Sequence, residues 1–248
     1  MTTALQTADR TAIPILEFGR AWMLAPSTSD HADDLGLDGL FGFWVNGRAG
    51  VIGDVDSDIA AAAIAIGSPS FVRRYWEHRP DTMGSLDCSA AYAETAAQWG
   101  REQLDSIDTI RLERLDELAK KVVMAADASV GMLFAGWRAL SHPHDPAGRV
   151  TVRLNVLREL RGGAHISAIH AVGLGPVGAI VSTDDPVRGG EQGATRFGWT
   201  GPFPKPDLVA RAKAELITSQ IAAVPFRSLG DAERGELADL VDEVHASL

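Results

Sequence analysis

Apolar residues recur at helical spacing along most of the chain, and this pattern predicts a mainly α fold. The clearest amphipathic stripe consists of Ile107, Ile110, Leu115, Leu118 and Val122. An apolar aromatic run over residues 41–45 is expected to close at Asn46 and Gly47. Further helices are predicted over residues 12–24, 59–66, 69–79, 87–102, 107–122, 128–140, 150–160, 207–223 and 231–246.

Residues 155–181 place ionisable groups and glycines between two apolar helical runs. The pattern predicts that a first helix breaks at the glycine pair 162–163 and that a short helix follows. A turn at 173–175 and another helix over 175–181 complete the segment. Together these elements have the outline of a helix-turn-helix. The ionisable side chains lie where the first helix is expected to break.

Residues 182–206 are dominated by Gly, Pro and polar side chains over about 25 positions. So long a segment without predicted structure is typical of a functional or mobile loop, here a candidate lid. The chain has 248 residues and is 46% hydrophobic, enough for a sizeable core. We expect a helical N-terminal domain over residues 1–143, packed on a helix-turn-helix-like C-terminal domain over residues 144–248.

The net charge of −10 opposes attraction to nucleic acid, because phosphate binding requires a local excess of Lys and Arg. A single cysteine, Cys88, excludes an internal disulfide framework. The first residues lack the pattern of a signal peptide, and no apolar run approaches the ~18 residues of a membrane span. The sequence therefore predicts a cytoplasmic protein with neither membrane nor nucleic acid as a partner.

Several motifs occur in an order that resembles a family of actinobacterial proteins of about this length that contain a helix-turn-helix. The motifs are residues 43–49 with the later Gly53, residues 157–165, the Gly-Trp-Thr of 198–200 and a final helical region over 218–229. The resemblance implies a helical N-terminal part and a winged helix-turn-helix part, and a context in specialised metabolism.

Two departures from that family pattern bear on function. Gly163 stands where members commonly have an aspartate, which removes one charged group. The proline-rich residues 201–206 stand where members continue into a second helix, a turn and a wing. The second departure predicts a degenerate winged part, and it argues against DNA binding.

The candidate chemistry centres on residues 158–165. Arg158 and Arg161 can hold an anionic ligand through paired donors, while His165 or Glu159 moves protons as the catalytic group. The alternative is that Arg158 and Glu159 form ion pairs that tie the two parts together, and that His165 caps the short helix. The sequence leaves both interpretations open.

Four further side chains are candidates for substrate binding. Trp44, Asn46 and Arg48 follow the aromatic run and can form a second wall of a pocket, and His170 follows His165. Arg48 lies in an otherwise apolar stretch and needs a counter-charge, which either a ligand or an acidic residue of the chain can supply.

No metal or cofactor is predicted. His170 follows His165 by five residues, whereas four would place both imidazoles on one helical face. The chain has no phosphate-binding glycine loop, no dinucleotide-binding glycine motif and no nucleophile elbow.

Two functions compete. The first is small-molecule binding between the two helical parts, in an enzyme such as a lyase, isomerase or cyclase that uses acid/base chemistry without a cofactor. The second is a ligand-responsive transcription regulator that reads DNA with residues 175–181, with phosphate contacts from Arg188 and Arg196. Those seven residues offer no side chain that reads base edges. A homodimer or a pure interaction module is a third alternative that the apolar helices allow.

Overall fold

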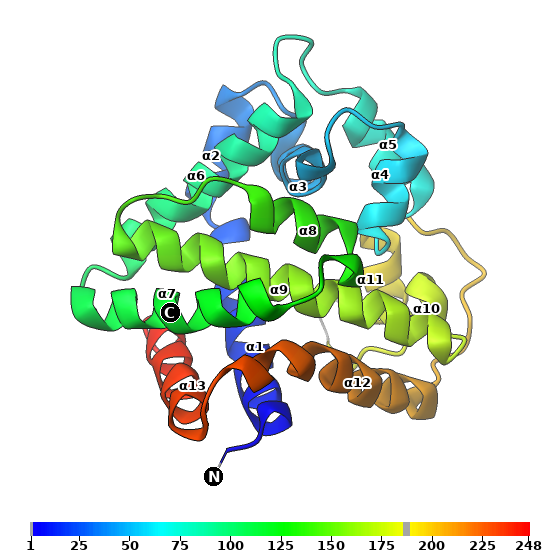
Figure 1. Cartoon of the computed structure of the whole chain (residues 1–248). Coiled ribbons are helices and arrows are strands. Elements are labelled where there is room, and N and C mark those ends of the chain that lie inside the picture. Colours follow the sequence, from blue (N-terminus) through cyan, green and yellow to red (C-terminus); the bar gives the residue numbers. More distant parts are fainter. Residues whose placement is uncertain (1, 186–188) are drawn as a thin grey trace.

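The computed structural model describes residues 2–185 and 189–248, and these residues form helices and no strand (Figure 1). The predicted mainly α class is confirmed. The elements up to residue 125 are α1 (Ala4–Met23), α2 (Pro26–Asp34), α3 (Gly39–Ala49), η1 (Gly50–Ile52), α4 (Ser57–Ile64), α5 (Pro69–Glu77), α6 (Ser85–Gln103) and α7 (Thr109–Ala125). The later ones are η2 (Ala128–Val130), α8 (Met132–Ala139), α9 (Pro146–Ala171), α10 (Gly175–Val181), α11 (Gly190–Arg196), α12 (Leu208–Ala223), η3 (Val224–Ser228) and α13 (Asp231–His245).

Helix α9 runs through the middle of the molecule and packs against α1, α6, α7, α8 and α12 (Figure 1). Its N-terminus is well defined, because Asp145 accepts a hydrogen bond from the amide of Gly148 at 2.7 Å and Pro146 occupies the first turn. Residues 150–157 are all buried. The helix is therefore covered on every side along this stretch.

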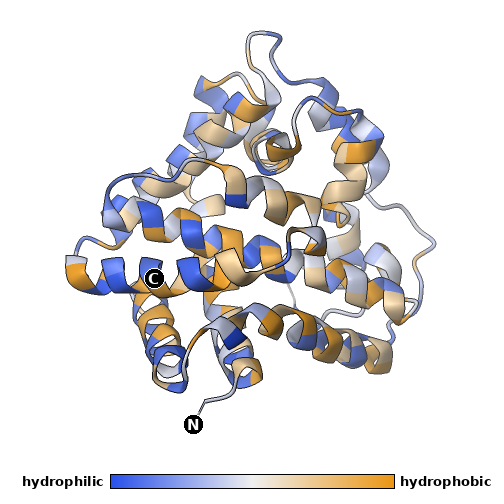
Figure 2. Cartoon of the chain, viewed as in Figure 1, coloured by the Kyte–Doolittle hydropathy of each residue, from blue (hydrophilic) through white to orange (hydrophobic). Residues whose placement is uncertain are grey.

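Polar side chains nevertheless interrupt α9 along its length (Figure 2), and its buried charged side chains have partners on other helices. Arg149 and Arg153 donate to the two carboxylate oxygens of Asp116 on α7, each at 2.9 Å. Arg153 and Asp116 are both buried. This ion-pair network fixes the first half of α9 against α7, because a buried charge without its partner is strongly unfavourable.

The predicted break at the glycine pair is wrong, since α9 continues through it to Ala171. Gly163 instead allows a close approach of the segment between α7 and α8. A Cβ at this position would lie 2.5 Å from the carbonyl oxygen of Val130. No short helix begins after Gly163, so His165 lies inside a long helix and cannot act as a cap.

Other boundaries also differ from the prediction. Helix α3 continues through Asn46 to Ala49 instead of closing there, and α1 begins at Ala4 behind a capping box formed by Thr3 and Gln6. The segment 182–206 contains α11, so it is not without structure.

The helix-turn-helix outline is present. Helices α9 and α10 are bent by 99° across a three-residue connection, and α10 has the predicted bounds.

Within the described ranges no single helix is long and apolar enough to cross a membrane. Helices α9 and α10 together meet the length and hydropathy required, but only as this bent pair. The division of the chain at residue 143 stays a prediction.

A matched pair of glycine substitutions tests the close approach at α9. Gly163→Ala should lower the free energy of unfolding by about 1–3 kcal/mol, because the new methyl group meets backbone atoms that cannot move away. Gly162→Ala should raise it by about 0.5–1 kcal/mol, because alanine is the better helix former, and its Cβ makes only ordinary contacts of 3.7 Å or more. Urea unfolding of both variants measures the difference, and equal effects would contradict this account.

Candidate functional site

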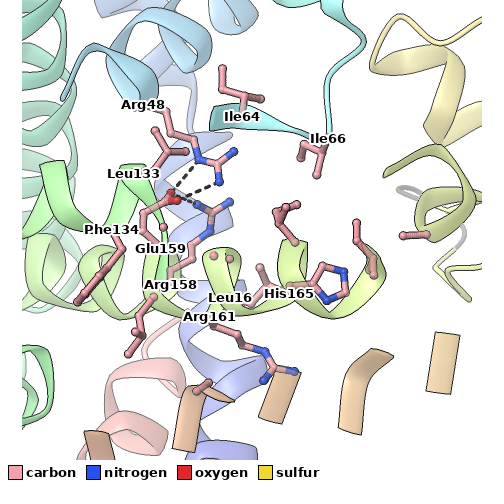
Figure 3. Close-up of a pocket in the computed structure, with 18 of the residues that line it drawn as sticks. Leu16, Arg48, Ile64, Ile66, Leu133, Phe134, Arg158, Glu159, Arg161 and His165 are labelled. Carbon is pink, nitrogen blue, oxygen red and sulfur yellow. Dashed lines mark hydrogen bonds and ion pairs between the residues drawn. The ribbon is translucent and has the colours of Figure 1, made fainter. Parts of the chain in front are cut away.

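A cavity of about 910 Å³ lies beside the second half of α9. This volume is within the range of roughly 300–1,000 Å³ that is usual for small-molecule sites. Its wall is mostly apolar, with side chains from α1, α3, α4, α8, α9 and α12 (Figure 3). Among the described residues the wall also carries six arginines and four carboxylates: Arg20, Arg48, Arg158, Arg161, Arg196 and Arg211, with Glu159, Asp184, Asp185 and Glu215.

Arg48 and Glu159 form a buried, bidentate ion pair on this wall. Nε of Arg48 donates to Oε1 of Glu159 at 2.8 Å, and Nη2 donates to Oε2 at 2.9 Å. Arg48 is 7% exposed and Glu159 is 1% exposed. The counter-charge that Arg48 requires is thus supplied by Glu159, and the pair joins α3 to α9.

Arg158 approaches the same carboxylate from α9. Its Nη1 donates to Oε1 of Glu159 at 3.0 Å, so Glu159 lies between two guanidinium groups (Figure 3). Gly19 on α1 makes room for this side chain, because a Cβ there would lie 2.8 Å from Cδ of Arg158. The position of Arg158 therefore depends on a glycine far away in the sequence.

These contacts determine the ionisation of Glu159. Burial by itself raises the pKa of this carboxyl group, but the charge of Arg48, its hydrogen bonds and the charge of Arg158 outweigh burial, and the pKa is lowered overall. Glu159 is therefore ionised, and both of its oxygens are occupied. In this arrangement Glu159 holds two arginines in place and is poorly placed to accept a proton.

A second polar cluster connects α9 to α12 at the same cavity. Arg161 and Arg211 donate to the two oxygens of Glu215, at 2.8 and 2.6 Å. His165 lies between them, with Nε2 3.0 Å from Nη1 of Arg211 and Nδ1 3.1 Å from Oγ1 of Thr218. The two clusters are one helical turn apart on α9.

The neighbours of His165 assign its tautomer. A guanidinium can only donate, so Nε2 accepts from Arg211 and Nδ1 carries the proton. The hydroxyl of Thr218 can accept from Nδ1, because its own hydrogen goes to the carbonyl of Ala214 at 2.8 Å. Burial, followed by the charges of Arg211 and Arg161, lowers the pKa of His165 to about 4 in spite of Glu215. His165 is a neutral imidazole at neutral pH.

The structure brings together most of the residues that the sequence indicated. Arg48, Glu159, Arg158, Arg161 and His165 all line the cavity, and both Arg48 and Arg158 are ion-paired with Glu159 there.

Trp44 also lines the cavity, and its ring lies 5.4 Å from the Arg48 guanidinium carbon. Asn46 does not, because it is fully buried and donates to the carbonyls of Gly42 and Tyr75. His170 is exposed near the end of α9, away from the cavity.

Several residues of the site are not evident from the sequence. Arg211 and Glu215 are spaced as an ordinary surface ion pair on a helix, and Thr218 follows at the same helical face. Their position opposite His165 comes from the packing of α12 on α9. The spacing of residues 211, 215 and 218 indicates that they share one face of a helix. It does not indicate which helix packs against that face.

Helix α10, which the sequence suggested as the DNA-reading helix, is largely buried. In α10 the residues 178–181 are buried, and Ile180 and Val181 pack with Ala194 of α11. Arg196 is an exposed residue that also borders the cavity, and Arg188 lies outside the described residues. As a recognition helix, α10 therefore presents neither a polar side chain nor a free apolar face.

No group of three or more His, Cys, Asp or Glu side chains that could hold a metal ion occurs within the part of the chain that the structure describes.

Residues 10–204 match the model of a family described as a helix-turn-helix family. Neither the curated proteins nor the solved structures contain a match to this chain.

Removal of Glu159 tests the buried ion pair. Glu159→Leu leaves the buried Arg48 without its counter-charge and should lower the free energy of unfolding by about 3–5 kcal/mol. The double variant Arg48→Met with Glu159→Leu should recover most of this loss, because apolar residues of similar size replace a buried pair at little cost. The surface variant Glu94→Leu, which removes an exposed partner of Arg101, should change stability by less than ~1 kcal/mol. Urea unfolding at pH 7 measures all three, and a loss in Glu159→Leu no larger than that in the surface variant would refute the assignment.

His165 gives a pH-dependent stability. Its pKa falls from 6.5 in the unfolded chain to about 4 in the folded protein, so the unfolded state binds the proton first as the pH falls. The contribution of His165 to the free energy of unfolding is fully present above pH ~6.5. It decreases by about 2–3 kcal/mol as the pH falls towards 4. The variant His165→Gln should lose correspondingly less stability between pH 7 and pH 4.5 than the wild type. His170→Gln, which changes an exposed histidine of the same helix, should behave like the wild type; a His165→Gln variant with an unchanged pH slope would contradict the prediction.

Proposed function

The chain belongs to this helix-turn-helix family, and we propose that it binds a small, largely apolar molecule in the cavity beside α9. The observation that carries the proposal is the lining of that cavity. An acidic chain with a net charge of −10 places six arginines, with four carboxylates, among apolar side chains around one space of about 910 Å³. Apolar walls with a few fixed polar groups are typical of ligand sites.

Acid/base chemistry without a cofactor is the enzymatic form of this proposal. His165 is the better candidate for the proton acceptor, because it is neutral and lies on the cavity wall. The lone pair of its Nε2 accepts a hydrogen bond from Nη1 of Arg211 at 3.0 Å, so a substrate would have to displace that contact. Glu159 then acts as a positioning residue for Arg48 and Arg158. A role in specialised metabolism rests on the sequence resemblance alone.

A ligand-responsive transcription regulator is the second candidate, and family membership favours it together with the 99° bend between α9 and α10. The burial of α10 shifts the expected DNA contact to α11, where Gln192, Thr195 and Arg196 are exposed. Arg196 also borders the cavity, so a bound ligand would lie next to the DNA-facing helix. The net charge of the chain opposes this candidate.

A neutral, apolar fluorescent dye tests whether the cavity binds ligands. Nile red should bind the wild-type protein with a blue-shifted emission, and Ile166→Trp, which fills the cavity from α9, should weaken binding about tenfold or more. Val209→Trp is the matched control, because Val209 is 82% exposed on α12 and does not line the cavity.

Equal dye binding by the two tryptophan variants, or none by the wild type, would exclude the cavity as the ligand site. Turnover of a displacing compound, lost in His165→Gln, would support the enzymatic form. A shift of DNA from upstream of the protein's own coding sequence that weakens between ~50 and ~200 mM salt would favour the regulator instead.

A further inference from the structure

We propose that Arg48 anchors a carboxylate group of the ligand, so that the cavity selects apolar carboxylic acids over neutral molecules of the same shape. This inference rests on the proposed function and names the class of ligand. It is carried by the hydrogen-bonding state and the surroundings of the Arg48 guanidinium.

The donors of Arg48 are only partly used within the chain. The guanidinium has five N–H donors, and Glu159 takes one from Nε and one from Nη2. Nη1 is buried and has no hydrogen-bond partner. A buried donor without a partner is costly, and a ligand oxygen in the cavity would remove this cost.

The unused side of the guanidinium is the edge formed by Nη1 and the second hydrogen of Nη2. Glu159 contacts the neighbouring edge formed by Nε and Nη2, and the unused edge faces the side of the cavity where Ile66 lies (Figure 3). Two parallel donors on one edge match the two oxygens of a carboxylate. The absence of a side chain at Gly162 keeps the surroundings of Nη2 uncrowded, because a Cβ there would be in van der Waals contact with Nη2 at 3.8 Å.

Arg48 is held in place before any ligand arrives. Glu159 fixes the guanidinium by two hydrogen bonds, the Trp44 ring packs against it, and Nε1 of Trp137 donates to the backbone carbonyl of Arg48 at 3.0 Å. A preorganised donor loses little conformational entropy on binding. Arg48 therefore has the properties of a binding anchor as well as those of a structural ion pair.

The rest of the wall defines the remainder of the ligand. Leu16, Ile64, Ile66, Leu133 and Phe134 contribute apolar side chains to the wall of the same cavity (Figure 3). These side chains give an apolar body a place to be buried, and the unused donors of Arg48 require an acceptor group rather than a cationic one. One in-plane edge suits one singly charged, planar group. An apolar monocarboxylic acid meets all of these conditions.

Displacement of Nile red by matched acids and amides tests the anchor. The probes are decanoic acid with decanamide and 1-naphthaleneacetic acid with 1-naphthaleneacetamide, at pH 7. In the wild type each acid should displace the dye at about tenfold lower concentration than its amide, because only the carboxylate forms a charge-assisted pair. In the double variant Arg48→Met with Glu159→Leu this preference should fall below about twofold.

The control variant Arg73→Met removes an exposed arginine that pairs with Asp58 outside the cavity, and it should keep the preference. Nile red binding by each variant shows that its cavity is intact. Equal displacement by acid and amide in the wild type would overturn the carboxylate anchor while leaving cavity binding in place. A preference that persists in the double variant, or that disappears in Arg73→Met, would likewise overturn the assignment to Arg48.

Discussion

The buried ion pair between Arg48 and Glu159 fixes α3 against α9, and the geometry of the cavity depends on it. Two charges removed from water are tolerated only when their hydrogen bonds are nearly ideal, and the bidentate contact at 2.8 and 2.9 Å meets that condition. Since α9 is one continuous helix, the pair also sets the register of the groups that follow Glu159. Arg161 and His165 reach α12 from positions that this one contact defines.

The mainly α class and the bounds of α10 could be predicted from helical spacing and turn residues, because those signals are local. The need of Arg48 for a counter-charge was also evident, yet its partner 111 positions away was not. Composition cannot distinguish a glycine that ends a helix from one that permits close packing, and Gly163 is of the second kind. The contribution of α12 to the site depends on how two helices pack, which no local pattern encodes.

The bend between α9 and α10, which gives the helix-turn-helix outline, has a different environment from that of a DNA-reading motif. Its second helix is short, lacks polar side chains and buries its apolar residues against α11. Trp199, in the Gly-Trp-Thr motif, donates to the carbonyl of Ile66 at 2.8 Å and so connects the residues after α11 to the end of α4. The segment from α10 to Trp199 is therefore attached at both ends to helices that surround the cavity. The bend between α9 and α10 forms part of the cavity wall.

His165 gives the cavity a further property. Histidine is the side chain whose charge ordinarily changes between pH 5 and 8, and here its titration is moved to about pH 4. The imidazole on the wall therefore contributes little change in charge over that interval. A weak acid that enters the cavity therefore meets a neutral imidazole at this point of the wall over most of that interval, so a pH dependence of its binding there does not arise chiefly from His165.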